Sequence, residues 1–384
     1  MIKVTYIGWL GYQNIGDEAF LPANMRLFPD CQLVPNNRRF ESKITLFGGG
    51  TLFPRWPVWI MKNKYNYAIG IGMRSPSFWG PPHPWQIEIL REFDFRFLGV
   101  RGPHSQEILA SYGIESTVTG DTALILEPDS YESTESGLVG INVTKTGRFK
   151  HDKGPNIWGF DEEQLINVMM RVCSKLEAMG YRLLLLSFHP DDTVYLKKIA
   201  KSLKKVEVLS NTTDPIRLLN AVARCEFLIG EKLHSTVFSA CCYVPFISLE
   251  YRPKCLDFTA SLGLEDFTVR TDELSAERIL DLFGELSQNR TQYSENLRLK
   301  VNRQRELLRQ YSRNIQEEWD ELDISWSTID EMVQISRQKL LKEKIRISSY
   351  IRRIFGLYDK HKIDFLSKIF MMAFYNMISI SYLV

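Results

Sequence analysis

The sequence predicts an α/β protein made of two doubly wound, Rossmann-like domains that face a cleft, followed by a C-terminal helical extension. Three observations predict this fold class. The chain of 384 residues is too long for one ordinary core. Apolar runs alternate with helical patterns in two successive series, and a polar, acidic stretch at residues 127–137 separates them. A hydrophobic content of 44% and a charged content of 24% exclude an intrinsically disordered chain.

The first series predicts an N-terminal domain over residues 1–130. Four apolar runs have the length of strands and lead into glycine-rich or polar loops: VTYIG, ITLFGGG, YAIGIG and FRFLGVRG. Because these runs are apolar on both faces, we expect a parallel sheet that helices cover on both sides.

The second series predicts another doubly wound domain over residues 131–278. Five runs read as strands: LVGINVT, RLLLLSF, VEVLS, EFLIG and PFISLE. Helical patterns separate them, over residues 162–179, after Asp191, from Asp214 and from His234. Two such domains in tandem give the GT-B-like architecture of many sugar-transferring enzymes, which by itself says nothing about the reaction.

The third region, residues 279–384, is predicted to be a helical extension with a charged helix around residues 295–322. The stretch from 337 to 368 holds ten Lys or Arg against three Asp or Glu, and residues 369–384 are strongly apolar. That apolar run is shorter than the roughly 20 residues of a spanning helix. An interfacial helix in which residues 337–384 contact an anionic membrane surface is one interpretation. A helix docked on the domains or on a second subunit, in a homo-oligomer, is the other.

Composition also bears on partners and location. Net charge is only +2, and the positive excess lies in the tail rather than in the folded domains, so nucleic acid is not expected as a partner. The six cysteines show no metal-ligand spacing, and the chain opens directly on a strand-like segment rather than on a secretory signal. We therefore expect a cytoplasmic protein, peripheral at the inner face of the cell membrane, with no metal.

Two glycine-rich segments follow strands of the first domain, where open parallel sheets bind ligands. The loop GWLGYQNIGDEAF carries Asn14, Asp17 and Glu18, and the segment GGGT carries Gly49 and Gly50. Glycines there let backbone N–H groups approach an anion or a sugar. The plainer interpretation is that the glycines permit a tight turn and that Asp17 caps a helix.

Basic residues follow other strands. Arg101 comes directly after FRFLGV, where a guanidinium can bind a carboxylate or phosphate with two hydrogen bonds; a surface ion pair is the alternative. The stretch FLIGEKLHS places Lys232 and His234 at a helix start, which favours phosphate binding and proton donation, or merely a histidine cap. Lys254 follows the next strand. His189 in SFHPDD is either a contact for the substrate that accepts a transferred group or part of a turn.

Seven segments, in order, resemble the polysaccharide pyruvyl transferase family over about residues 4–260. They are GYQNIGDEAF, GGGTLF, VRGPHSQEIL, GDTALIL, GINVT, SFHPDD and KLHSTVFSACCYVPFISLEYRPK. The resemblance implies that phosphoenolpyruvate donates an enolpyruvyl group to a sugar, which closes as a ketal, without a further cofactor.

By the same resemblance, Arg101, His234 and Lys254 hold the donor, and Asp17 acts at the acceptor hydroxyl. The chain departs from the family at Lys232, where the Arg-Leu-His triplet has arginine; lysine keeps the charge but loses the forked geometry. From the chemistry we assign Arg101 and Lys254 to the donor anions with help from Lys232, His234 to the phosphate or to protonation of C3, and Asp17 to the attacking hydroxyl.

The sequence thus predicts a pyruvyltransferase that acts on a bacterial surface polysaccharide or on its lipid-linked precursor. Two other functions stay open. One is a GT-B glycosyltransferase that uses a nucleotide sugar. The other is a non-catalytic assembly partner of the same fold, and the departure from the family's triplet at Lys232 is the feature that favours it. The acceptor sugar is not predicted.

Overall fold

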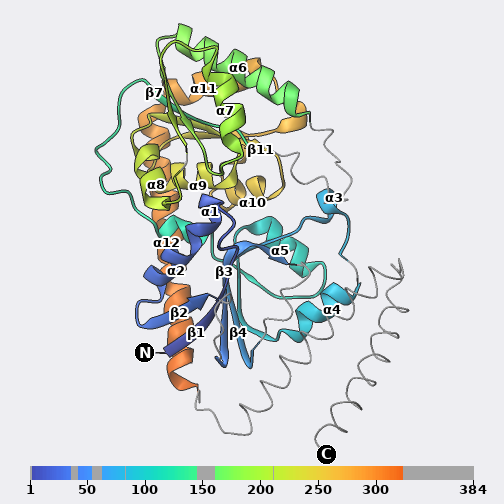
Figure 1. Cartoon of the computed structure of the whole chain (residues 1–384). Helices are drawn as coiled ribbons and strands as arrows, with labels where there is room; N and C mark the ends of the chain where they lie inside the picture. The colour runs from blue at the N-terminus through green and yellow to red at the C-terminus, as the bar shows by residue number, and fades with distance from the viewer. Residues whose placement is uncertain are drawn as a thin grey trace, which may run out of the picture. The chain divides into compact units, whose positions relative to one another are not determined.

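The computed structural model of the 384-residue chain describes residues 2–35, 42–53, 63–82, 84–144, 161–210 and 212–322. The predicted membrane-contacting tail at 337–384 lies outside these residues. Within the described ranges, no helix combines the length and the apolar character that crossing a bilayer would need. Two parallel sheets with flanking helices make up this part of the chain (Figure 1).

The first sheet has six parallel strands in the order β2-β1-β3-β4-β5-β6. Its strands are β1 (Ile2–Ile7), β2 (Cys31–Pro35), β3 (Ile44–Phe53), β4 (Tyr65–Met73), β5 (Phe95–Val100) and β6 (Thr117–Val118). Nearly every residue of β3 and β4 is buried, as expected for central strands covered on both faces. The apolar runs predicted four of these strands. The short edge strands β2 and β6 were missed because they lack a long apolar run.

Helices of the first domain connect these strands. They are α1 (Ile15–Glu18), α2 (Phe20–Leu27), α3 (Pro76–Trp79), α4 (Pro84–Glu92) and α5 (Pro103–Ala110), followed by the 3₁₀-helix η2 (Thr122–Ile125). The helix α5 starts at Pro103, since proline suits the first turn of a helix.

The second sheet also has six parallel strands, in the order β12-β11-β10-β7-β8-β9. Its strands are β7 (Leu138–Asn142), β8 (Arg182–Leu186), β9 (Val206–Leu209), β10 (Phe227–Gly230), β11 (Phe246–Glu250) and β12 (Thr268–Arg270). Its helices are α6 (Glu162–Ala178), α7 (Asp192–Ala200), α8 (Pro215–Ala223), α9 (Leu233–Cys241) and α10 (Lys254–Ser261). The five predicted strands and four predicted helices are all present, and β12 was not anticipated.

Strand order locates the ligand-binding edge of each domain. The order reverses between β1 and β3 in the first sheet and between β7 and β10 in the second. Open α/β sheets bind ligands outside the carboxyl ends of the strands at such a reversal. The glycine-rich loop after β1 and the Lys232–His234 segment after β10 therefore lie at these two positions.

The carboxyl edges of the two sheets meet each other. The backbone N–H of Ile15, after β1, donates to the carbonyl of Phe188, after β8, at 3.0 Å. Ser105, at the start of α5, donates through its backbone N–H and its hydroxyl to the carboxylate of Asp257 in α10, at 3.0 and 2.7 Å. Segments following strands of both domains thus form one contiguous region.

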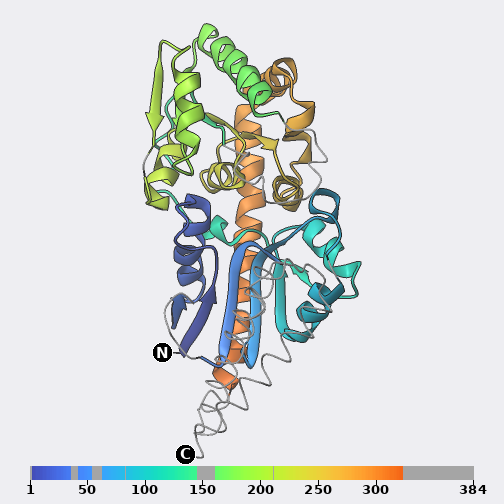
Figure 2. The same cartoon turned by 45° about the vertical axis from the view of Figure 1, so that its right-hand side comes forward.

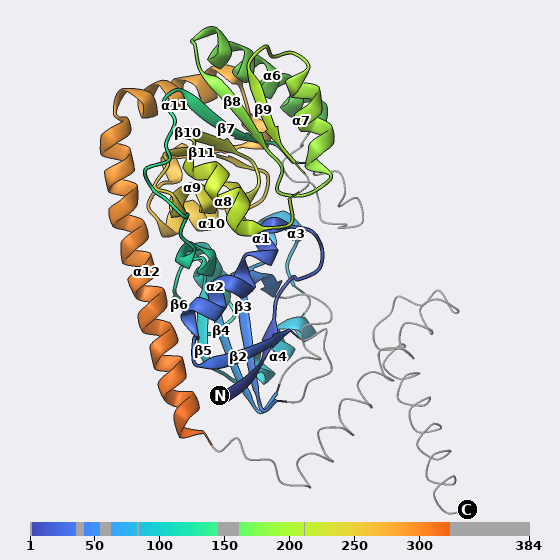
Figure 3. The same cartoon turned by 60° about the vertical axis from the view of Figure 1, so that its left-hand side comes forward.

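Two C-terminal helices complete the described chain. Helix α11 (Ala276–Gln288) contributes Ile279, Phe283 and Leu286 to the core of the second sheet, so the predicted boundary at residue 278 falls inside a helix of that domain. The 32-residue helix α12 (Arg290–Glu321) corresponds to the predicted charged helix and runs beside both sheets (Figures 2 and 3).

The buried Arg305 holds α12 at the junction. Its guanidinium donates to the backbone carbonyls of Leu124 and Leu126, from the first domain, and of Cys241, from α9. Near the end of the helix, the buried ring of Trp319 stacks on Phe28 at 5.0 Å. The helix therefore contacts both domains.

Candidate functional site

The glycine-rich loop after β1 is closed by its own side chains. The N–H of Gly11 donates to Oε1 of Glu18 at 2.7 Å, and Nδ2 of Asn14 donates to Oδ2 of Asp17 at 2.5 Å. Asn14 is the N-cap of α1, so Asp17 does not cap this helix, and the plainer interpretation of Asp17 does not hold. The loop presents the Asp17 carboxylate toward the second domain.

Burial raises the pKa of Asp17 above its usual range. The positive charges of Lys254, Lys232 and Arg101 oppose this shift, as does the hydrogen bond from Asn14. Three of the predicted cations therefore lie within electrostatic reach of the predicted acceptor base.

The glycines of β3 have a packing role in this structure. Gly49 and Gly50 have φ values of +99° and +85°, where a side chain would be strained. A Cβ atom on Gly49 would lie 2.4 Å from the ring of Phe20, and one on Gly50 would lie 2.9 Å from that of Trp9. Both residues are buried. Contact of Gly49 or Gly50 with an acceptor stays a prediction, and close packing already requires glycine here.

Arg101 lies in the protein interior, not in the surface ion pair that was the alternative. Its Nε donates to Oδ2 of Asp121 at 2.9 Å, and the two side chains are 1% and 0% exposed. Its Nη1 is buried and has no hydrogen-bond partner among the described residues. A Cβ on Gly72 would come within 2.8 Å of this Nη1, so the strand β4 makes room for the guanidinium.

The start of α5, directly after Arg101, is docked against the second domain by the Ser105–Asp257 hydrogen bonds described above. Gly102, the N-cap of α5, allows this contact, because a Cβ there would lie 2.0 Å from the carbonyl oxygen of Asp257. Asp257 belongs to α10, which begins with Lys254. The two helix starts that carry Arg101 and Lys254 are therefore joined directly.

His234 is the second residue of α9 and packs against the loop after β1. Its ring contacts Gly16, where a Cβ would lie 2.0 Å from Nδ1, and it meets the ring of Phe20 edge-on at 4.9 Å. Nε2 lies 4.0 Å from Oδ2 of Asp121 and, like Nη1 of Arg101, has no hydrogen-bond partner in the part of the chain that is described. The N-cap of α9 is Lys232, so His234 is not a helix cap.

Burial lowers the pKa of His234 well below its usual value. The positive charges of Arg101, Lys254 and Lys232 lower it further. The imidazole is therefore neutral near pH 7, and an anion bound beside it would raise its pKa again.

Lys254 is the first residue of α10. Burial and the neighbouring Arg252 charge lower its pKa to about 7, while Asp17 acts in the opposite direction. Its ammonium lies 5.1 Å from the centroid of the Tyr251 ring, a cation–π contact. A lysine with this pKa changes its charge close to neutral pH.

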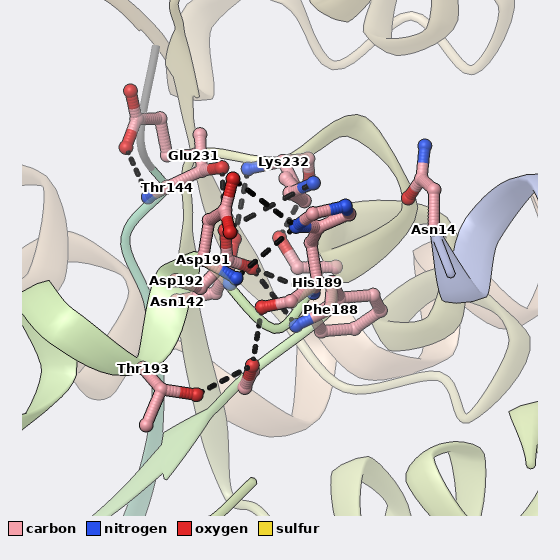
Figure 4. A network of polar contacts seen from close by, with 12 residues as sticks. Asn14, Asn142, Thr144, Phe188, His189, Asp191, Asp192, Thr193, Glu231 and Lys232 are labelled. Atoms are coloured by element: carbon pink, nitrogen blue, oxygen red, sulfur yellow. Dashed lines mark hydrogen bonds and ion pairs between the residues drawn. The ribbon is translucent and has the colours of Figure 1, made fainter. Parts of the chain in front are cut away.

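Lys232 lies in a hydrogen-bonded network at the strand-order reversal of the second sheet (Figure 4). Its backbone N–H donates to Oδ1 of Asn142 at 2.9 Å, and its Nζ lies 3.9 Å from Oδ1 of Asp192. The same Asp192 oxygen accepts from the hydroxyl of Thr144 at 2.7 Å, whose backbone N–H donates to the buried Glu231. Asp192 therefore restrains the ammonium of Lys232 from one side.

His189 belongs to this second network. The ring Nδ1 of His189 accepts from the backbone N–H of Asp191 at 3.1 Å, and the backbone N–H of His189 donates to Oδ2 of Asp192 at 2.9 Å (Figure 4). These contacts account for a His-Pro-Asp turn, and a role for His189 toward the acceptor stays a prediction.

The structure brings Arg101, Lys232, His234 and Lys254 together around Asp17, from four separate segments of the chain. The sequence patterns assigned no role to three buried carboxylates of this region. Asp121 accepts from Arg101, Asp192 lies beside Lys232, and Asp257 accepts from Ser105 at the start of α5. Asp121 lies in the GDTALIL segment, so its motif was noticed without a role. Nothing in the spacing indicated Asp257. In the described ranges, no three His, Cys, Asp or Glu side chains gather as a metal site requires.

A polysaccharide pyruvyl transferase domain matches residues 9–253 of this chain. The match covers more than half of the sequence and includes nearly all of the residues of the site. The chain belongs to the polysaccharide pyruvyl transferase family. No curated protein sequence matches it significantly.

Solved structures share its fold at low sequence identity. A putative UDP-N-acetylglucosamine 2-epimerase from Listeria monocytogenes aligns over 84% of this chain and 98% of its own, with a TM-score of 0.53 and 12% identity. The UDP-GlcNAc 2-epimerase from Neisseria meningitidis, bound to UDP-GlcNAc, aligns over 84% and 100%, with a TM-score of 0.51 and 10% identity. Staphylococcus aureus MnaA with UDP aligns over 77% and 91%, with a TM-score of 0.51 and 12% identity. The chain thus has the predicted GT-B-like fold.

Proposed function

We propose that this chain transfers the enolpyruvyl group of phosphoenolpyruvate to a sugar of a surface polysaccharide or its precursor, forms a pyruvate ketal and releases phosphate. The observation that carries the proposal is the gathering of Arg101, Lys232, His234 and Lys254 from both domains beside the carboxylate of Asp17. Phosphoenolpyruvate has a carboxylate and a phosphate, which need such cations.

Donor binding falls to Arg101 and Lys254, with Lys232 assisting. The unpartnered Nη1 of Arg101 is a buried donor, and a buried donor without a partner is costly until an acceptor reaches it. Each charge-assisted hydrogen bond contributes about 1.5–3 kcal/mol, so loss of one weakens binding about tenfold or more.

His234 serves the phosphate and the protonation of C3. The imidazole is neutral in the free protein because burial and three cations lower its pKa. The negative charge of the donor offsets the cations, so binding raises this pKa and the ring takes up a proton. Transfer of that proton to C3 leaves C2 electron-poor and returns His234 to its neutral form.

Asp17 then acts on the acceptor. Its carboxylate takes the proton of the attacking hydroxyl as the oxygen bonds to C2. A second hydroxyl of the same sugar then attacks C2, the bond from C2 to the phosphate oxygen breaks, and phosphate leaves with the second hydroxyl proton. The burial that raises the pKa of Asp17 makes it a better proton acceptor than an exposed carboxylate.

A lipid-linked acceptor at the inner face of the membrane would give the basic segment 337–384 a role. The motivation is the excess of Lys and Arg between 337 and 368. Full-length protein should then sediment with anionic vesicles and a chain ending at residue 322 should not. Equal partitioning of the two would remove this part of the proposal.

The reaction is tested by incubating the protein with phosphoenolpyruvate and a panel of galactosides and N-acetylmannosaminides. The expected result is phosphate release together with a mass gain of one pyruvic acid less one water on one acceptor. His234→Ala is the matched variant, and unchanged turnover in this variant would refute the role of His234. If phosphate is released but no acceptor in the panel gains mass, the protein hydrolyses the donor without transferring it. If no phosphate is released with any acceptor, the result agrees with the non-catalytic assembly partner.

A second candidate is a glycosyltransferase that uses a nucleotide sugar, since the fold is shared with proteins whose structures hold UDP-GlcNAc or UDP. A thermal-shift comparison separates the two. Stabilisation by phosphoenolpyruvate and not by UDP-GlcNAc supports the pyruvyl transfer, and the reverse supports the glycosyltransferase.

A further inference from the structure

Asp121 is a buried carboxylate at the junction of the two domains to which no role has been given. It is the N-cap of η2 and 0% exposed, and its Oδ1 accepts from the N–H of Ala123 at 3.0 Å. One oxygen is therefore fixed by the backbone. The other, Oδ2, is directed at the donor site.

Oδ2 of Asp121 lies between two residues assigned to the donor. It accepts from Nε of Arg101 at 2.9 Å and lies 4.0 Å from Nε2 of His234. Arg101 comes from the first domain and His234 from the second. Two buried nitrogen atoms that have no hydrogen-bond partner among the described residues, Nη1 of Arg101 and Nε2 of His234, thus belong to the two residues beside this carboxylate.

The contact through Nε matters because a guanidinium has several donors in a fixed plane. Holding Nε fixes the orientation of that plane and leaves the terminal nitrogens for a ligand. Gly72 supports this position, because any Cβ there would press on Nη1. The imidazole is equally restrained, since its Nδ1 side faces Gly16 and its ring edge faces Phe20.

Charged groups of both domains act on His234 and Asp121. Arg101, Lys232 and Lys254 act on the imidazole, and all three lower its pKa. Asp121 itself experiences Arg101, which lowers its pKa, and Asp257, which raises it, while burial is the largest cause of its raised pKa.

We propose that Asp121 is a positioning residue of the donor site, which orients the guanidinium of Arg101 and selects the Nε2-protonated tautomer of His234. This inference rests on the proposed function only for the identity of the ligand. A negative oxygen facing Nε2 favours a proton there, while Nδ1 is covered by the backbone at Gly16. A single carboxylate thereby aligns one donor-binding group from each domain.

The first experiment needs no substrate and uses the full-length protein. ¹⁵N-labelled histidine reports the tautomer of each ring by NMR, and comparison with His234→Gln identifies the signal of His234. The expected signal is the Nε2-protonated neutral form near pH 7, lost or mixed with the other tautomer in Asp121→Asn. An Nδ1-protonated ring in the wild-type protein, or an identical tautomer in Asp121→Asn, would overturn the inference.

The second experiment measures kinetics. Asp121→Asn should raise the KM for phosphoenolpyruvate at least tenfold and shift the pH profile of kcat/KM, because Arg101 and His234 lose their common partner. The control is the same substitution at an exposed position, Asp214→Asn at the N-cap of α8, where Oδ1 accepts from the N–H of Ile216 at 2.9 Å, and it should leave both unchanged because asparagine also caps helices well. A folded Asp121→Asn enzyme with wild-type KM and pH profile refutes the inference.

The two experiments keep this inference separate from the proposed function. If the wild-type protein does not bind phosphoenolpyruvate, the proposed function fails, while the tautomer of His234 still decides the role of Asp121. If Asp121→Asn does not fold, the wild-type tautomer alone supports or overturns it.

Discussion

The two Rossmann-like domains contribute different functional groups to the site. The first domain supplies the carboxylates Asp17 and Asp121 and a single cation, Arg101. The second domain supplies Lys232, Lys254 and the imidazole of His234. The groups proposed to hold the donor are therefore spread over both domains. Asp17, the carboxylate proposed to act on the acceptor, lies near the cations Lys232 and Lys254 of the second domain.

The two domains also differ in how they place these groups. In the first, glycines bring the backbone close to other side chains, as at Gly16 and Gly72, and the loop after β1 is closed by Glu18. In the second, helix starts place the cations, at the beginnings of α9 and α10. Neither domain holds a complete site, so substitutions at the junction should affect stability and donor binding together.

The largest effect is expected for Arg101→Met, which removes the partner of a fully buried carboxylate. Leaving one member of a buried ion pair typically costs about 3–5 kcal/mol. Denaturant unfolding should show this loss, and calorimetry should show no binding of phosphoenolpyruvate. The matched control, Arg171→Met, breaks an ion pair with Glu277 whose side chains are 65% and 67% exposed, and should leave the free energy of unfolding almost unchanged. Equal losses in the two variants would contradict the importance of Arg101 burial.

The next largest effect is expected for Gly16→Ala, which tests whether the loop after β1 fixes the position of the His234 ring. The added Cβ would lie 2.0 Å from Nδ1 of His234, and this ring cannot move easily because Phe20 packs against it. Overpacking of this kind costs about 1–3 kcal/mol. The KM for phosphoenolpyruvate should rise about tenfold or more.

Gly284→Ala is the control for that glycine substitution. Gly284 lies in α11 with nothing within 4 Å of an added Cβ. Alanine is a better helix former there by about 0.5–1 kcal/mol, so the melting temperature should rise slightly and the KM should not change. A Gly16→Ala protein with unchanged KM would show that His234 does not touch the donor.

Much of the fold was predictable because central strands of parallel sheets are apolar on both faces. The runs that became β3, β4, β8 and β10 stand out for this reason, and Asp214 signalled the N-cap of α8. The edge strand β6, with only two residues, carries no such pattern, and its pairing with β5 depends on the tertiary structure.

The convergence of Arg101, His234 and Lys254 was predictable because each follows a strand of a parallel sheet, and the carboxyl ends of such strands share one edge. Asp257 was not predictable, because it contacts Ser105, 152 positions away, and no local pattern encodes that distance. The glycines at positions 49 and 50 were noticed for ligand contact, whereas the structure shows that Phe20 and Trp9 already require them. Sequence pattern thus predicted the charged groups better than it predicted what holds them.

A smaller effect concerns pH and the cation at the start of α10. Since the pKa of Lys254 is lowered to about 7, its charge is lost as the pH rises through 7, and affinity for phosphoenolpyruvate should fall by up to about tenfold per pH unit above that value. The same group acts on stability in the opposite direction. Between pH 7 and its ordinary pKa the unfolded chain binds more protons, so this residue makes folding more favourable as the pH rises.

Lys254→Arg is the variant that isolates this effect. Arginine stays charged at all these pH values. Titration calorimetry across pH 6–9 should therefore show a flatter affinity profile in the variant. A wild-type profile that is already flat would mean that Lys254 does not bind the donor.

The smallest effect is expected for Lys232→Arg, which restores the arginine of the family's Arg-Leu-His triplet. Lys232 is 14% exposed and restrained by Asp192 at 3.9 Å, so the site has a carboxylate that a guanidinium could also contact. A forked donor should bind the phosphate more firmly, which predicts a KM for phosphoenolpyruvate that falls a few-fold while kcat hardly changes. Lys232→Met, which removes the charge, should instead raise the KM about tenfold. If both variants leave KM unchanged, the anion does not reach this side of the second domain, and donor binding rests on Arg101 and Lys254 alone.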